Sequence, residues 1–317
     1  MLEPICYFFY IQLLRKSLFL RPSTQLNKYQ QMIVNPTKML VIVFFSILNW
    51  SAFSQKDSTS RYTALNKGKI FLSWGGNREA FTKSDITFKG DNYHFTLQDV
   101  EAHDKPKGWH IDYINPTRIT IPQTNLKVGY FITNTYYMAL GVDHMKYVMT
   151  QNQYANIDGY INLPTNEPGA LYNGVYQNEP IQTTEDFLTF EHTNGLNYVY
   201  LEFGRFDDLS SLFGIKNTDI FQINITEALG AGVLYPKTNT KLLQKDRYDE
   251  FHVSGYGISL NAGLNLTFFK HFFIQGDLRG GFINMPDIRT TSNSNDSASQ
   301  HFMFIQSVIS LGGIFKI

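Results

Sequence analysis

The sequence has little cysteine, little charge and no long hydrophobic run. Its 317 residues include a single cysteine, Cys6, which excludes a disulfide framework and any cysteine-built metal site. Charged residues make up only 17%, and 27 basic residues balance 27 acidic ones, which argues against a nucleic-acid binder. The mean hydropathy of -0.22 excludes a polytopic helical membrane protein. Aromatic residues are plentiful at 15%, and a chain this apolar is not disordered. A soluble β protein and a transmembrane β-barrel remain.

The main apolar run, Met39–Trp50, is too short to cross a bilayer core as a helix, which needs about 20 residues. Lys38 precedes it and the small residues of 51–54 follow it, as in a secretory signal peptide. We therefore expect a cleaved signal peptide over residues 32–54 and a short lead over 55–66. Residues 1–31 are then either an upstream extension or a long basic n-region.

Residues after the lead alternate between apolar and polar, and this period of two is typical of β-strands. In Gly255–Phe268 every second residue from Tyr256 onward is apolar, and the residues between them are Gly, Ser, Asn or Thr. The same split recurs upstream and downstream and predicts about eight strands. Glu227 alone breaks the apolar face of its strand, so either a bulge near Gly230 and Gly232 re-aims it or the local register is different.

The predicted connections alternate in length. Short links lie at 133–135, 206–218 and 269–271, whereas long loops lie near 76–122, 150–194, 235–253 and 285–300. Short turns on one side and long loops on the other are typical of outer-membrane barrels. Within the first long loop, 84–89 and 93–100 read as a hairpin that either projects beyond the membrane or extends the wall. Aromatic pairs near strand ends, among them Tyr136–Tyr137 and Phe272–Phe273, suggest aromatic girdles.

The export signal, the alternation and the last strand, Val308–Ile317, resemble a Gram-negative outer-membrane β-barrel protein of the Bacteroidetes type, in the small eight-stranded OmpA/OmpX-like class. The resemblance implies an all-β fold over residues 67–317: an antiparallel up-and-down transmembrane β-barrel with short periplasmic turns and long extracellular loops. It implies location in the cell outer membrane. It also implies contact with lipid and lipopolysaccharide, and recognition of the C-terminal strand by the barrel-assembly machinery.

Several charged residues fall on the face that a membrane barrel turns to its lumen. They are Lys69, Lys127, Asp143, Glu202, Asp277, Arg279 and Lys316. Both signs occur in near balance, and an eight-stranded barrel is only wide enough for its own side chains. We therefore expect a paired charge network that fills the lumen, in preference to a selectivity lining or a proton path.

Aromatic residues of the long loops are candidates for contact with a surface ligand or glycan. They are Trp109, Tyr113, Tyr154, Tyr160, Tyr172 and Tyr176. Loops rich in Tyr, Asn and Gly form adaptable contact surfaces. The alternative for the first long loop is a cap that shields the barrel mouth, and the alternative for the second is an exposed, weakly ordered loop without a functional role.

The expected function is structural or recognitional, with no cofactor and no metal. The first alternative is a membrane-embedded hydrolase or acyltransferase acting on lipid A or phospholipid. It would need a serine such as Ser254 or Ser259 near His144 or His252, and no Gly-x-Ser-x-Gly motif is present, so no catalytic residue is assigned. The second alternative is a small-solute channel.

Overall fold

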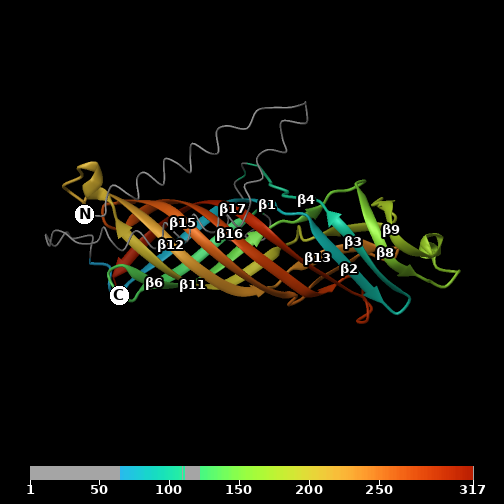
Figure 1. Cartoon of the computed structure of the whole chain (residues 1–317). Helices are drawn as coiled ribbons and strands as arrows, with labels where there is room; N and C mark the ends of the chain where they lie inside the picture. The colour runs from blue at the N-terminus through green and yellow to red at the C-terminus, as the bar shows by residue number, and fades with distance from the viewer. Residues whose placement is uncertain (1–64, 109, 111–121, 317) are drawn as a thin grey trace, which may run out of the picture. The chain divides into compact units, whose positions relative to one another are not determined.

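The computed structural model describes residues 65–108, 110 and 122–316 (Figure 1). The expected upstream extension and signal peptide, most of the expected lead, Trp109 and Tyr113 lie outside the described residues. Two short 3-10 helices, η5 (Pro168–Tyr172) and η6 (Ser210–Phe213), accompany the strands. Among the described residues no helix is long and apolar enough to span a membrane.

Eight antiparallel strands pair in sequence order and form a ring. They are β1 (Lys69–Phe81), β5 (Thr124–Phe131), β6 (Tyr136–Met145), β11 (Leu196–Asp208), β12 (Phe221–Leu234), β15 (Gly255–Phe268), β16 (Phe272–Arg289) and β17 (Ser297–Lys316). The ring is complete because β1 pairs with β5 on one side and with β17 on the other, from Lys69–Lys316 to Phe81–Phe304. This is the predicted up-and-down barrel.

The barrel wall carries its apolar side chains outside. Exposed residues on its outer surface include Leu72, Val128, Met138, Leu140, Leu201, Phe203, Leu229, Ile258, Leu264, Ile274, Leu278, Ile309 and Leu311; we call them the belt. Polar residues such as Ser73, Asn224, Asn265 and Gln306 are buried on the inner side. An apolar exterior around a polar interior is the arrangement of a barrel in lipid, so the predicted alternation is confirmed with the predicted sidedness.

One local expectation about the wall is wrong, and a second is right for only one ring of an aromatic pair. β12 pairs without interruption with both neighbours, so no bulge re-aims Glu227, which lies directly opposite Arg205 of β11. The aromatic pairs do not all point outward, because neighbouring residues of a strand face opposite sides. Tyr136 is 38% exposed whereas Tyr137 is 3% exposed, so one ring of the pair faces outward and the other fills the interior.

The predicted long loops are largely strands, and the described chain has 17 strands in place of about eight. Several barrel strands continue past the predicted loop boundaries, since β1 reaches Phe81 and β16 reaches Arg289. The nine further strands are β2 (Ser84–Gly90), β3 (Tyr93–Val100), β4 (Ala102–His103), β7 (Val148–Met149), β8 (Tyr154–Ile161), β9 (Gly174–Gln182), β10 (Leu188–Glu191), β13 (Lys237–Leu242) and β14 (Tyr248–Phe251). We call the part of the molecule that they build the cap.

The cap consists of two sheets around its own core. β2, β3, β8 and β9 extend the barrel sheet from the first residues of β17, where Ser297 pairs with Lys89. β14, β13, β10, β7 and β4 form the second sheet. Ile86, Phe88 and Leu97 of the first sheet are buried in one cluster with Leu188 and Phe190 of the second. The hairpin predicted at 84–100 therefore extends the wall.

Strand β17 runs through both parts and its polarity reverses on the way. Near its start Phe302 and Phe304 are buried together with Gln300, and His301 is exposed. Further along, Gln306 and Ser310 are buried together with Val308, and Ile305, Ile309 and Leu311 are exposed together with Ser307. The reversal falls between residues 304 and 306. It separates a water-facing part from a lipid-facing part of one continuous strand.

Candidate functional site

A charged network crosses the lumen. Arg279 comes from β16, and its guanidinium reaches Asp143 of β6 through Nη1 and Glu202 of β11 through Nη2, the latter at 2.9 Å. Lys127 of β5 places Nζ 2.7 Å from the other oxygen of Glu202. β16 and β6 are four places apart in the eight-membered ring, so the Arg279–Asp143 pair joins opposite sides of the wall.

Each carboxylate of the network also accepts a phenolic hydrogen bond. Tyr137 donates to Glu202 Oε1 at 3.1 Å, and Tyr200 donates to Asp143 Oδ1 at 3.2 Å. The Arg279 guanidinium lies 4.3 Å from the centroid of the Tyr200 ring. Two cations and two anions are thus paired, hydrogen-bonded and buried. A buried group of this kind is destabilising to break because the remaining charge loses its partner.

The other three predicted lumen charges lie apart from this network. Asp277 accepts hydrogen bonds from the amides of Asn261 and Gln275, at 3.0 and 2.9 Å. Lys69 is half-buried at the end of β1 and lies 3.4 Å from the Asn66 side chain. Lys316 is exposed at the end of β17, where it pairs with Lys69 of β1.

Sequence reasoning missed the tyrosines of the network and a second polar layer near the cap. There Gln123 bridges the carboxylates of Glu79 and Asp104 through Nε2, and Gln306 donates to Glu79 at 3.1 Å. The strand pairing indicates these inward tyrosines, because a glycine lies opposite each of them. Gly204 lies opposite Tyr137, and Gly141 lies opposite Tyr200. A Cβ at either glycine would come within 2.2 Å of the tyrosine ring, so the glycines make room for the rings.

A cavity of about 20 Å³ lies next to Lys127 and Tyr137 and is lined largely by aromatic and polar side chains. This volume holds about one water molecule. Phe71, Phe131 and Phe273 contribute to the lining, although two of them belong to the pairs predicted to form girdles. The cavity therefore borders the network at Lys127 and Tyr137.

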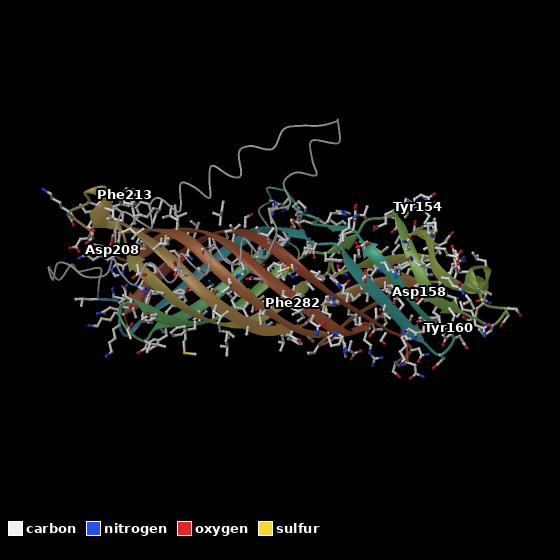
Figure 2. All side chains as sticks on the ribbon, in the orientation of Figure 1. Tyr154, Asp158, Tyr160, Asp208, Phe213 and Phe282 are labelled. Carbon is white, nitrogen blue, oxygen red and sulfur yellow. The ribbon has the colours of Figure 1, made fainter. Side chains whose placement is uncertain are left out.

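The exposed face of the cap carries two of the predicted contact tyrosines. Tyr154 and Tyr160 of β8 are 73% and 44% exposed, and Asp158 is exposed on the same face between them. Figure 2 shows these three residues at the end of the molecule opposite Asp208 and Phe213. On the β3 side their cross-strand neighbours are polar, with Thr96 opposite Asp158 and His94 opposite Tyr160. On the β9 side Tyr160 lies opposite Val175, which is 76% exposed.

The other two described tyrosines pack against the cap core. The Tyr172 ring lies 5.1 Å from the Phe187 ring, and the Tyr176 hydroxyl donates to the Tyr172 carbonyl oxygen at 2.6 Å. Burial in the cap shifts the pKa values of two further side chains. It lowers the pKa of His192 to about 3 and raises the pKa of Tyr147 to about 12.

The serine and histidine side chains do not form a nucleophile–base pair at His252. Its Nε2 lies 2.8 Å from Asp287 Oδ2, but Ser254 Oγ donates to the carbonyl oxygen of His252 at 3.4 Å and not to its ring. The His144 Nδ1 atom lies 2.8 Å from Asn197 Oδ1. Among the described residues, no group of three His, Cys, Asp or Glu side chains is placed to hold a metal ion.

No protein-family model matches the sequence, and no curated protein matches it. Solved structures with a similar course of the chain are outer-membrane proteins. OprG from Pseudomonas aeruginosa is 11% identical with a TM-score of 0.36, covering 80% of this chain and 99% of its own. Ail of Yersinia pestis, solved with the heparin analogue sucrose octasulfate, is 9% identical with a TM-score of 0.27, covering 78% and 99%. Likeness at this level says nothing about a ligand or activity.

Proposed function

We propose that this chain is an outer-membrane protein whose filled barrel anchors a folded cap for recognition at the cell surface. The observation that carries the proposal is the reversal of polarity along β17. It supports a position of the belt in lipid and of the cap in water. The even number of strands in the ring puts the beginning of β1 and the end of β17 at the same end. After export that end faces the periplasm, and the cap faces outward.

The proposed partners follow from these two surfaces. The belt contacts outer-membrane lipid, including lipopolysaccharide in the outer leaflet. The last strand is the segment that the barrel-assembly machinery reads. The exposed face of β8 contacts a surface ligand or glycan, because a tyrosine offers a flat apolar ring and a hydroxyl together and Asp158 between the two rings accepts hydrogen bonds from sugar hydroxyls.

The filled lumen supports anchoring over transport. The Arg279 network joins opposite walls, and a solute would have to break buried ion pairs to pass it. Purified protein in planar bilayers is therefore expected to show no channel conductance. Steady single-channel steps would contradict the filled lumen and leave the membrane location untouched.

Surface labelling tests the location and orientation. In a Cys6→Ser background, a cysteine at Tyr154 in the cap should react with a membrane-impermeant maleimide on intact cells. A matched cysteine at Asn217, exposed in the connection between β11 and β12, should react only after the envelope is permeabilised. The opposite pattern would reverse the orientation, and labelling of both in a soluble fraction would refute the membrane barrel.

Binding to immobilised polysaccharide tests the recognition face. Cells that display Tyr154→Ala and Tyr160→Ala together should bind less than cells that display the unchanged chain. The matched control is Leu171→Ala, which removes an exposed apolar side chain of η5 (66% exposed) elsewhere in the cap. Equal loss in both variants, or no loss in either, would contradict glycan contact at β8.

A further inference from the structure

The connection between β11 and β12, residues 209–220, exposes large apolar side chains at the end of the barrel opposite the cap. Leu212 is 77% exposed, Phe213 62% and Ile220 56%. It is longer than the two neighbouring turns of that end, at 132–135 and 269–271, and sequence reasoning treated it as a short link. Figure 2 shows Phe213 standing on this connection.

Hydrogen bonds fix the backbone of this connection. Ser210 is buried; its N–H donates to Asp208 Oδ1 at 2.7 Å, and its Oγ accepts from the N–H of Ile223 at 3.0 Å. η6 ends at Gly214, whose φ of 70° turns the chain back, and the N–H of Ile215 donates to the Ser210 carbonyl at 3.0 Å. A fixed backbone therefore presents Leu212 and Phe213 outward.

The next turn of the wall shares the apolar surface. Phe269 and Phe272, at either side of the β15–β16 turn, are 62% and 64% exposed. The N–H of Phe269 donates to the Ile220 carbonyl at 2.9 Å, and Lys270 forms an ion pair with Asp219 at 2.8 Å. The two connections thus form one surface, which we call the apron: Leu212, Phe213, Ile220, Phe269 and Phe272.

The apron is continuous with the lipid-facing belt. β12 leads from Ile220 through the ring pair Phe221–Phe268, 5.2 Å between centroids, and β16 leads from Phe272 to the belt residue Ile274. Charged residues border it: Lys216 is exposed, and Asp219 and Lys270 are paired. Apolar side chains next to lipid, bordered by charges, fit the boundary between acyl chains and headgroups.

We propose that the apron inserts into the periplasmic leaflet of the outer membrane, with Leu212 and Phe213 among the acyl chains and Lys216 at the phosphate level. This inference rests on the proposed membrane location. The occupant is the lipid of the surrounding bilayer. Insertion of this connection fixes how deeply the periplasmic end of the barrel sits in the bilayer.

Depth-dependent quenching in vesicles tests the insertion. In the full chain with Cys6→Ser, Phe213→Cys carries an environment-sensitive fluorophore, and Leu212→Cys is the second position if the first variant folds poorly. Leu229→Cys, in the belt, and Asn217→Cys, on the polar part of the same connection, are the controls. We expect the label at 213 to be quenched about twofold more by lipids spin-labelled near the headgroup than by mid-chain spin labels, and to be shielded from aqueous iodide.

The controls separate the two possible failures. Lipid quenching at Leu229 with only iodide quenching at Phe213 and Leu212 would overturn the insertion and keep the membrane barrel; the apron would then be free to meet a periplasmic protein. Absence of lipid quenching at Leu229 would overturn the membrane barrel itself. Lipid quenching at Asn217 equal to that at Phe213 would overturn the proposed border at Lys216.

Discussion

The barrel and the cap are built from strands of the same kind with opposite sidedness. In the barrel the outer face is apolar and the inner face holds Arg279, Glu202 and their partners. In the cap the inner face holds Phe88, Leu97 and Phe190, whereas Asp158 faces outward. The difference shows that alternation fixes which residues share a face, and that the surrounding solvent decides which face is buried.

Removal of Arg279 should have the largest effect. Arg279→Met leaves Asp143 and Glu202 buried without their shared cation, and the free energy of unfolding should fall by about 3–5 kcal/mol. Urea unfolding in vesicles, followed by the gel mobility of unheated samples, measures the change.

Lys83→Met is the matched control in the cap. Lys83 pairs with Glu101 at 2.6 Å, but both side chains are more than half exposed, so the loss should stay within about 1 kcal/mol. Equal losses in the two variants would show that the lumen network is no more buried than a surface pair.

An arginine placed on the outer face should next distinguish the two parts. Leu229 in the belt and Leu171 in the cap are similarly exposed, at 59% and 66%. Leu229→Arg should destabilise the barrel by about 2–4 kcal/mol if it lies near the middle of the bilayer, whereas Leu171→Arg should change stability by less than about 0.5 kcal/mol. The same urea assay compares them. If Leu229→Arg left the stability unchanged, the outer face would not be in contact with lipid.

Acid should weaken the cap through His192, by the smallest of the three effects. Nδ1 lies 3.0 Å from Thr238 Oγ1 and Nε2 3.4 Å from Gln300 Nε2, so the ring is held neutral. Its pKa falls from 6.5 to about 3 on burial, so the unfolded cap binds the proton first, and stability is lost as pH falls from 6.5 toward 3.

By this linkage the cap should lose about 2 kcal/mol between neutral pH and pH 5. Protease nicking of the cap at the two pH values, with the barrel intact on gels, measures the loss. His192→Gln removes the titrating ring and should flatten the dependence. An unchanged pH dependence in that variant would assign the effect to other groups.

The barrel could be predicted from the sequence because lipid imposes one rule on every wall strand. The same rule placed Lys127, Asp143, Glu202 and Arg279 on the inner face. It could not pair them, because the Arg279–Asp143 contact depends on which strands lie opposite in the closed ring.

The cap was harder to predict because its strands are short and their partners are distant. Only the hairpin of β2 and β3 was recognised, since its strands are adjacent in sequence. β10 pairs with β13 across about fifty residues, and neither has a long alternating pattern. Tyr137 was assigned to a girdle because residue type alone does not distinguish the two faces of a strand; its glycine partner across the pair does.

The double role of β17 has a consequence for the order of assembly. β17 closes the ring against β1 and also provides the edge on which β2 begins the cap sheet. Until it arrives, both β1 and β2 present open edges, which are templates for pairing with other chains. A chain truncated before residue 297 therefore lacks both the β1–β17 pairing that closes the barrel and the β17–β2 pairing on which the cap sheet begins. Exposure of a finished cap at the surface then reports that β17 has been inserted.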